Sequence, residues 1–217
     1  IKSTAIAVFV KTPGLSPLKT RLAATIGMAN AEQFYRLSLK AIEKTLSSVN
    51  ATPFWAVGEV SGLSDPLWQG FECIHTGEGG LGERQHHIYQ SLLAEYEQVI
   101  LIGADAPQLS PKRIAQAIAA LDSHKFALGP AEDGGYYLFA GSAPLPRESW
   151  TSLAYSRSDT AAKLLEQLSS STAILDSLTD VDTTEDLEVL KEQLLAEPSL
   201  TSEQQTIIRW INNLHAN

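Results

Sequence analysis

The chain has 217 residues, of which 44% are hydrophobic and 19% are charged, and its formal net charge is −9. Enough apolar residues are present to bury a core, which excludes a disordered chain, and no apolar stretch approaches the roughly 18 residues of a membrane span. The negative charge disfavours nucleic acid or an anionic membrane as a partner. The single cysteine, Cys73, and the lack of a signal-peptide layout at the first residues predict a small enzyme in a reducing cytoplasm.

The charge is unevenly distributed along the chain. Residues 1–44 hold seven basic and two acidic residues, whereas the remainder is strongly acidic. A cationic N-terminal region on an acidic body is suited to capturing a small phosphate-bearing ligand. We assign Arg36, Lys40 and Lys44 to the solvated face of a helix, which leaves the bases of the preceding loop as the candidates for binding.

Strands alternate with helices in the hydrophobic pattern. A continuous apolar run predicts a buried strand at Ala5–Val10, followed by a loop over Lys11–Pro17 and a helix over Leu18–Ile26. Further strands are predicted at Pro53–Val57, Phe71–His75, Val99–Ile102, Phe126–Leu128 and Tyr136–Phe139. Further helices are predicted over about 30–48, 81–96, 110–121, 158–168 and 184–195, and from Thr201 onward.

This alternation indicates βαβ units in an α/β fold with a mostly parallel sheet. The strands near 126–140 are too close for a crossover helix, so we expect one antiparallel excursion there. Residues 1–217 are therefore predicted to form a single domain, with a C-terminal helical extension at about 199–217.

Three sequence pairs match the capping-box pattern at a helix N-terminus. They are Asn30 with Gln33, Thr183 with Asp186, and Thr201 with Gln204. The last helix has an apolar face that would either pack within the chain or form a dimer contact, so a homodimer is one alternative. This face consists of Ile207, Ile208, Trp210, Ile211 and Leu214.

The loop after the first strand resembles a phosphate-binding P-loop but lacks its second glycine. Leu18 stands in that place, and Pro17 removes a backbone N–H. What remains is a short loop that presents Lys11, Lys19 and Arg21 at the C-terminal end of a strand. Open α/β sheets bind their ligands at that edge.

A second glycine-rich segment, Gly77–Gly82, matches the G-x-G-x-x-G pattern of dinucleotide-binding folds. Such a fold needs an acidic residue about 20 positions further on, whereas Asp105 lies 28 residues after Gly77. We therefore disfavour a nicotinamide or flavin site. Two interpretations stay open: a flexible loop, or a loop that accommodates a nucleotide.

Two acidic segments are candidates for a magnesium site. Asp105 ends the apolar segment Val99–Asp105 and would either bind Mg²⁺ beside phosphate oxygens or hydrogen-bond within its own turn. Asp180 and Asp182 alternate with Val181, so both can face one side of an extended segment. Two carboxylates plus substrate phosphates are a usual Mg²⁺ site.

Glu132–Tyr137 combines an Asp-Gly turn signal with two tyrosines. The segment is either a simple hairpin turn or a wall against which a sugar packs. The five histidines lack zinc-ligand spacing, and no G-x-S-x-G elbow is present.

Taken together, these motifs resemble a known family. FVKTPGLSPLKTRLA, GGLGERQ, LIGADAPQLSP, GPAEDGGYYLFA and TDVDTTEDL occur in that order. They resemble bacterial and archaeal glycosyltransferase-like proteins of the nucleotide-diphospho-sugar transferase superfamily, some of which are assigned to arsenosugar biosynthesis. The first loop is also similar to the lysine-x-arginine loop of phospholactate and molybdenum-cofactor guanylyltransferases. The resemblance implies a single-domain GT-A fold, which is Rossmann-like.

The resemblance also implies roles for individual residues. The catalytic group would be Lys19, Arg21 and Asp105, and the metal ligands of Mg²⁺ or Mn²⁺ would be Asp105 with Asp182 or Asp180. The nucleotide would be bound by Lys11, Thr12, Pro13, Gly14, Lys19, Arg21, Gly80, Leu81, Gly82, Arg84 and Asp105. The sugar or acceptor would lie near Asp133, Gly134, Gly135, Tyr136, Tyr155 and Ser156.

Two departures from the family pattern bear on substrate preference rather than on the fold. Family members commonly have Asp-Leu-Gly-x-Arg-Met where this chain has Gly80–Gln85, and Cys-Pro where it has Ala106-Pro107.

The expected substrates are a nucleotide sugar or a nucleoside triphosphate, together with a small acceptor. Glycosyl transfer from a nucleotide-diphospho-sugar, nucleotidyl transfer from a triphosphate, and non-catalytic nucleotide binding in a regulatory protein are the three alternatives.

Overall fold

A seven-stranded mixed sheet forms the centre of the protein, in a computed structural model that describes residues 3–168 and 171–214. The strand order is β3-β2-β1-β4-β6-β5-β7, and among the described strands β6 alone runs antiparallel to its neighbours. The strands are β1 Thr4–Val10, β2 Thr52–Val57, β3 Glu72–His75, β4 Gln98–Gly103, β5 Phe126–Pro130, β6 Tyr136–Gly141 and β7 Thr172–Ile174. The predicted α/β class, with its antiparallel excursion, is confirmed.

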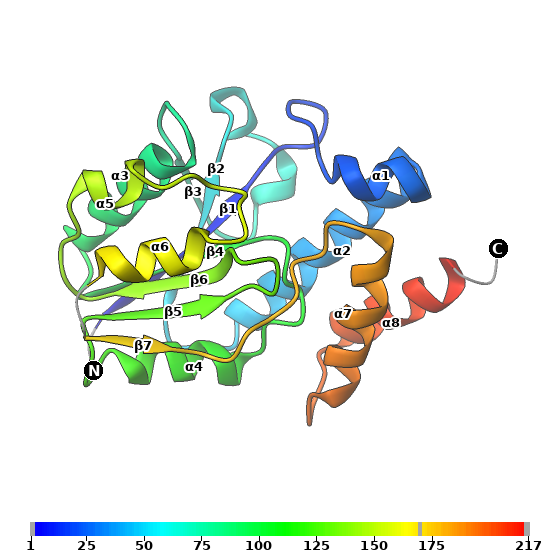
Figure 1. Ribbon diagram of the computed structural model, residues 1–217. Helices are drawn as coiled ribbons and strands as arrows, with labels where there is room; N and C mark the ends of the chain where they lie inside the picture. The colour runs from blue at the N-terminus through cyan, green and yellow to red at the C-terminus, as the bar shows by residue number, and fades with distance from the viewer. Residues whose placement is uncertain (1–2, 169–170, 215–217) are drawn as a thin grey trace.

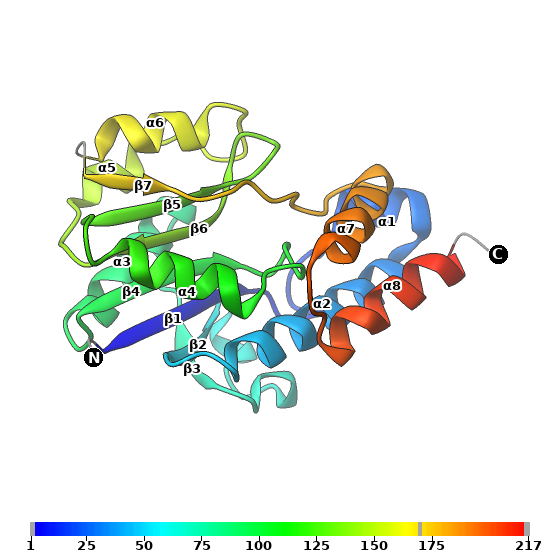
Figure 2. The ribbon, with the colours of Figure 1, turned by 90° about the horizontal axis from the view of Figure 1, so that it is seen from below.

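Helices cover both faces of this sheet. α2 and α4 pack on one face, and α3, α5 and α6 pack on the other (Figures 1 and 2). The helices are α1 Thr20–Ile26, α2 Met28–Leu46, α3 Leu81–Leu93, α4 Pro111–Ala120, α5 Arg147–Thr151, α6 Thr160–Gln167, α7 Thr184–Ala196 and α8 Ser202–Leu214, with 3₁₀ turns at Val60–Gly62 and Pro66–Trp68. None of the described helices is long and apolar enough to cross a membrane.

The unbroken apolar run of β1 follows from burial on both sides. Ile6, Val8 and Val10 contribute to the core under α2 and α4, whereas Ala5 and Ala7 contribute to the core under α3, α5 and α6. Because successive side chains of a strand point to opposite faces, a central strand of a covered sheet is apolar at nearly every position.

A third apolar cluster joins the two ends of the chain. α7 and α8 pack against α1 and α2 in this cluster. α7 contacts α1, and α8 contacts α2, alongside which it runs in Figure 2. Ile207 and Ile211 of α8 are fully buried, and the ring of Trp210 lies 5.5 Å from that of Phe34. The apolar face of the last helix therefore packs within the chain.

Two of the three predicted capping boxes form. The Asp186 carboxylate accepts the N–H of Thr183, and Thr201 and Gln204 exchange hydrogen bonds. The Asn30 prediction is wrong, because α2 already begins at Met28, directly after the positive-φ residue Gly27 that also ends α1. Asn30 instead donates to the carbonyl of Ile26 at 2.8 Å, which satisfies the end of α1.

The strand order places a ligand crevice between β1 and β4. From β1 the chain proceeds to β2 and β3 on one side, and it then returns to form β4 on the other side of β1. Such a reversal is the topological switch point at which open α/β sheets bind ligands, beyond the C-terminal ends of the strands. The loop after β1 and the segment after β4 meet there.

Candidate functional site

A cleft of about 860 Å³ opens at this switch point. Its wall collects side chains from three distant segments: the loop after β1, the turn after β4, and the segment before α7. The charged residues that these segments contribute are Lys11, Lys19, Arg21, Asp105, Asp180 and Asp182. Cationic and acidic candidates that the sequence separates by up to 171 residues therefore share one cavity.

Lys19 is an enclosed member of this charged set. Its ammonium lies 2.5 Å from Oδ1 of Asp105, and it donates a hydrogen bond to the carbonyl of Val181. The Lys19 side chain is 5% exposed, whereas that of Asp105 is 46% exposed. Asp105 thus faces the cleft with one oxygen already paired to an internal cation.

Arg21 is placed differently. Its side chain is 73% exposed, and its guanidinium lies 3.5 Å from the carboxylate of Asp182, whose side chain is 49% exposed. An exposed pair at this distance is worth little to stability because water and salt screen it. Arg21 can therefore leave Asp182 for an anionic ligand at small cost.

The acidic wall carries more negative charge than Lys19 neutralises. Burial raises the pKa of Asp180 to about 7, and the charges of Asp105 and Asp133 act in the same direction. The opposing attraction of Lys19 is smaller than these effects. A cluster of hard carboxylate oxygens with unbalanced charge is suited in chemistry to Mg²⁺ or Mn²⁺.

The metal group is not preassembled, however. Within residues 3–168 and 171–214, no three His, Cys, Asp or Glu side chains are arranged as a metal-binding group. Mg²⁺ commonly uses only one or two carboxylates and completes its shell with water and phosphate oxygens. The donor set present here fits that pattern.

Hydrogen bonds hold the segment before α7 against the rest of the cleft. The Gln108 side chain donates to the carbonyl of Thr179 at 2.8 Å, and the hydroxyl of Thr179 donates to Glu132 at 2.8 Å. The N–H of Asp182 donates to the Asp186 carboxylate at 2.9 Å. Both candidate metal ligands of this segment, Asp180 and Asp182, therefore lie between anchored positions.

The far wall of the cleft contains the predicted acceptor residues Asp133, Gly135, Tyr136, Tyr155 and Ser156. The Tyr136 hydroxyl donates to Gln85, and that of Tyr155 donates to the carbonyl of Trp150 at 3.0 Å. Burial raises the pKa of Tyr136, and it raises the pKa of Tyr155 to about 12. Both phenols therefore stay protonated at neutral pH and can donate or accept hydrogen bonds.

The glycine loop before α3 is fixed by Arg84. The Arg84 guanidinium donates to the carbonyls of Gly58 and Gly79 and to the Thr76 hydroxyl, at 3.0, 3.0 and 2.7 Å. Arg84 thereby ties the loop to the ends of β2 and β3. Arg84 and Leu81 both line the cleft.

Several predicted nucleotide and acceptor residues are not among those that line the cleft: Thr12, Pro13, Gly14, Gly80, Gly82 and Gly134. Thr12 is buried and donates its N–H to Glu59 at 2.9 Å. A Cβ on Gly82 would lie 2.5 Å from the carbonyl oxygen of Trp150, and one on Gly134 would lie 2.0 Å from that of Ser158. These two glycines allow close backbone packing beneath the wall.

The cleft also contains residues that the sequence analysis did not select: Tyr35, Glu59, Thr76, Gln85, Arg157 and Thr160. Tyr35 sits within the apolar stripe of α2, so no local signal marks it. Its hydroxyl donates to the carbonyl of Lys11 at 2.9 Å. Arg157 directly follows Tyr155-Ser156, and its side chain is 63% exposed. Its position next to these two predicted residues is the signal by which the sequence could have indicated it.

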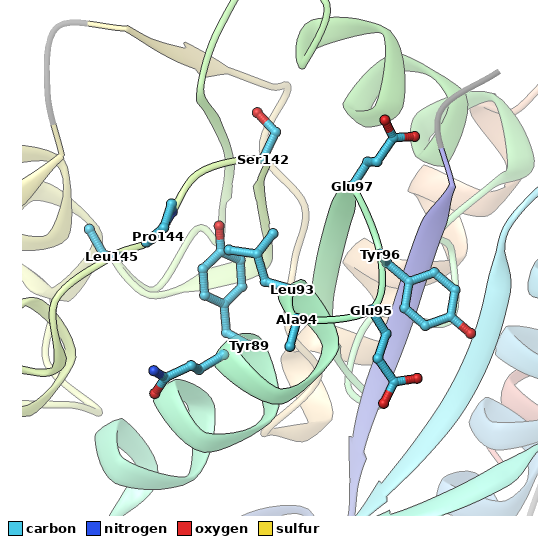
Figure 3. Close-up of a pocket in the computed structure, with 10 residues that line it drawn as sticks. Tyr89, Leu93, Ala94, Glu95, Tyr96, Glu97, Ser142, Pro144 and Leu145 are labelled. Atoms are coloured by element: carbon cyan, nitrogen blue, oxygen red, sulfur yellow. The ribbon is translucent and has the colours of Figure 1, made fainter.

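A second cavity of about 850 Å³ lies away from this cleft, near the start of β1. Its wall includes Tyr89, Tyr96, Glu95 and Glu97, together with Ser142, Pro144 and Leu145 (Figure 3). The Tyr89 hydroxyl is already bonded to the carbonyl of Ala143 at 2.6 Å. This cavity lacks the opposed cationic and acidic groups of the cleft.

Comparison with known proteins places the chain in a family. Residues 45–157 match the family described as "Uncharacterized protein conserved in bacteria (DUF2064)". The chain belongs to this family. The matched region of DUF2064 includes Asp105, Arg84 and Asp133, whereas Lys19, Asp180 and Asp182 lie outside it. No curated protein matches the sequence.

Solved structures share the fold. A "putative nucleotide-diphospho-sugar transferase" from Desulfovibrio desulfuricans G20 is 24% identical with a TM-score of 0.87, over 99% of this chain and 97% of that one. CMP:2-keto-3-deoxy-manno-octonic acid synthetase, complexed with CTP, is 14% identical with a TM-score of 0.52, over 89% and 98%. Rv0371c from Mycobacterium tuberculosis H37Rv, solved with manganese, is 14% identical with a TM-score of 0.52, over 91% and 100%. This DUF2064 protein therefore has the fold of nucleotide-diphospho-sugar transferases.

Proposed function

We propose that the protein is a transferase that acts on a nucleotide-activated substrate in the cleft between β1 and β4. The observation that carries this proposal is the convergence of Lys11, Lys19 and Arg21 with Asp105, Asp180 and Asp182 at the switch point of the sheet. Cationic side chains neutralise phosphate charge, and carboxylates hold a divalent cation beside phosphate oxygens.

The cleft would bind the nucleotide at one end and the sugar or acceptor at the other, and different residues form each end. Arg21 and Lys11 would neutralise the phosphates, with the Arg84-held glycine loop beside the nucleotide. Asp133 and Tyr155, with their neighbours on the far wall, would contact the sugar or acceptor. Mg²⁺ or Mn²⁺, held by Asp105 with Asp182 or Asp180, would supply further charge neutralisation at the phosphate oxygens.

Glycosyl transfer is the first candidate reaction. The bond from the anomeric carbon of a nucleotide-diphospho-sugar to its phosphate oxygen breaks, the acceptor oxygen forms the new bond at that carbon, and a nucleoside diphosphate leaves. The family resemblance of the five motifs supports this choice, together with the fold shared with the Desulfovibrio protein. Arg21 would stabilise the negative charge that develops on the departing diphosphate.

Nucleotidyl transfer is the second candidate, and the basic loop favours it. An acceptor oxygen would attack the α-phosphorus of a nucleoside triphosphate, and pyrophosphate would leave. The synthetase solved with CTP has the same fold, and a triphosphate would bring the greater negative charge to Lys11, Lys19 and Arg21.

A ligand panel with product analysis tests the proposal. Thermal shift would be recorded with nucleotide sugars and with nucleoside triphosphates, each with and without Mg²⁺. Release of a nucleoside diphosphate from a nucleotide sugar supports glycosyl transfer, and release of pyrophosphate supports nucleotidyl transfer. Binding without either product indicates a regulatory protein, and no binding at all overturns the proposal.

A matched pair of variants locates the site. Asp105→Ala should abolish metal-dependent nucleotide binding. Asp176→Ala removes a carboxylate that is 84% exposed and lies outside the cleft, so it should leave nucleotide binding unchanged. Unchanged binding by Asp105→Ala would remove Asp105 from the site.

A further inference from the structure

Lys19 occupies an unusual position for a residue expected to face phosphates. Its backbone is left-handed, with φ 45° and ψ 43°, immediately before the first residue of α1. This conformation costs a non-glycine residue about 1–2 kcal/mol. It directs the side chain inward, where the ammonium lies 2.5 Å from Asp105 and 6.0 Å from the ring centroid of Phe34.

The ammonium closes a three-way junction. Lys19 pairs with the side chain of Asp105 and donates to the carbonyl of Val181. The N–H of Val181 donates in turn to the backbone carbonyl of Asp105 at 3.1 Å. The loop after β1, the turn after β4 and the segment before α7 are thereby held together at one cation.

The junction is anchored on the side of α7. Val181 is fully buried in the cluster that α1, α2, α7 and α8 share. Its neighbours in sequence, Asp180 and Asp182, both line the cleft. A displacement of the Lys19 ammonium would therefore also shift the carboxylates of Asp180 and Asp182, which flank Val181.

We propose that Lys19 is a built-in counter-ion of the acidic wall, and that a divalent cation displaces its ammonium from Asp105 on binding. The identity of the metal site rests on the proposed function. An ammonium at 2.5 Å and a metal ion compete for the same carboxylate, and their positive charges repel each other. Lys19 accordingly lowers the intrinsic metal affinity of the site and keeps its carboxylates in place while the metal is absent.

The displacement gives Lys19 a second role. Once the metal holds Asp105, the released ammonium lies within the same cleft as Arg21 and Lys11 and can pair with phosphate oxygens. Metal entry thereby makes one more cation available to the nucleotide. Lys19 is in this sense a positioning residue before metal binding and a phosphate ligand afterwards.

Metal binding alone, without nucleotide, tests the proposal. Free Mn²⁺ would be measured by electron paramagnetic resonance during titration of the wild type, Lys19→Met and Lys11→Met. Lys19→Met should bind Mn²⁺ about tenfold more tightly, because a positive charge beside the ion has been removed. Lys11→Met removes an equal charge from an exposed position on the same cleft and should change the affinity by about twofold or less.

A second measurement uses the wild type alone. Reductive methylation read by mass spectrometry should label the 5% exposed Lys19 far more slowly than the exposed Lys11 in metal-free protein. Saturating Mg²⁺ should raise the labelling of Lys19 severalfold and leave that of Lys11 unchanged. This result remains informative if Lys19→Met fails to fold, which circular dichroism would reveal.

The outcomes separate this inference from the proposed function. A folded Lys19→Met with unchanged or weaker Mn²⁺ affinity overturns the inference. The absence of Mn²⁺ binding by both the wild type and Lys19→Met also overturns it. With an unfolded Lys19→Met, unchanged Lys19 labelling in Mg²⁺ overturns it. Tighter Mn²⁺ binding in a protein that binds no nucleotide would support the counter-ion role and refute the transferase.

Discussion

Replacement of Gly134 by alanine should destabilise the protein through two separable effects. Gly134 has φ +91°, a conformation that costs an L-residue about 1–2 kcal/mol. An added Cβ would lie 2.0 Å from the carbonyl oxygen of Ser158 and 2.4 Å from its carbonyl carbon. Because both are backbone atoms, the segment must move, and overpacking of this kind costs about 1–3 kcal/mol.

The two contributions together give a loss of about 2–5 kcal/mol for Gly134→Ala, measured as the free energy of unfolding in urea. The melting temperature should fall by roughly 5–15 °C. The carbonyl of Gly134 also accepts the N–H of Ala161 at 2.9 Å. The same displacement should therefore shift Ser156 and Arg157 on the acceptor wall.

Gly14→Ala is the matched control. Gly14 has φ +84° but no heavy atom within 4 Å of an added Cβ, so this variant carries the backbone strain without the close contact. It should lose only about 1–2 kcal/mol. Equal losses in the two variants would refute the argument that the loop at Gly134 is packed against the backbone of Ser158.

Three further changes address the cleft and its supports. Arg21→Gln should alter the free energy of unfolding by less than about 0.5 kcal/mol, because the ion pair of Arg21 with Asp182 is exposed. The same variant should bind nucleotide about 10- to 100-fold more weakly in calorimetry. A large loss of stability with intact nucleotide binding would contradict this prediction. Asp186→Ala removes the acceptor of two backbone N–H groups before α7 and should cost about 1–2 kcal/mol in urea unfolding, whereas the exposed Glu185→Ala should cost close to nothing. Burial lowers the pKa of His86, and the charge of Arg147 acts in the same direction. The neutral His86 side chain therefore contributes stability above pH 6.5, and this contribution is lost as the pH falls through the pKa of His86 in the folded protein. His86→Gln should consequently lose less stability than the wild type between pH 7.5 and pH 5, and parallel pH profiles would exclude the effect.

The strands that run through the core were predictable from sequence because their burial is uniform. β1 and β4 lie between neighbouring strands and under helices on both faces, so nearly every position is apolar and the run is unmistakable. β7, by contrast, has three residues at the edge of the sheet and leaves Ile174 exposed. An edge strand this short has no pattern that a sequence window can detect.

The cleft was predictable at the level of its segments. Residues that follow parallel strands gather at one edge of a sheet, and this rule brought Lys11–Arg21 and Asp105 together. Asp180 and Asp182 were candidates because they alternate with Val181, and the motif resemblance assigned them to the metal; the structure places both on the cleft wall. The roles assigned to these residues stay predictions.

The pairing inside the cleft was not predictable. The contact of Lys19 with Val181 joins positions 162 residues apart and depends on the left-handed backbone at Lys19. Left-handed lysines are rare, and no neighbouring residue signals one. At Asn30 the opposite occurs: the sequence contains a capping pattern, but no cap forms there because Gly27 has already set the start of α2.

The junction at Lys19 also determines when the site can form during synthesis. β1 and α1 emerge from the ribosome before β4, whereas Val181 follows α1 by more than 150 residues. At about 5–20 residues per second, the nascent chain waits roughly ten seconds or more for that partner. Until then, Lys19 and Asp105 lack the segment before α7, to which both are hydrogen-bonded. Ligand capture by this protein therefore has to wait until the segment before α7 has been translated.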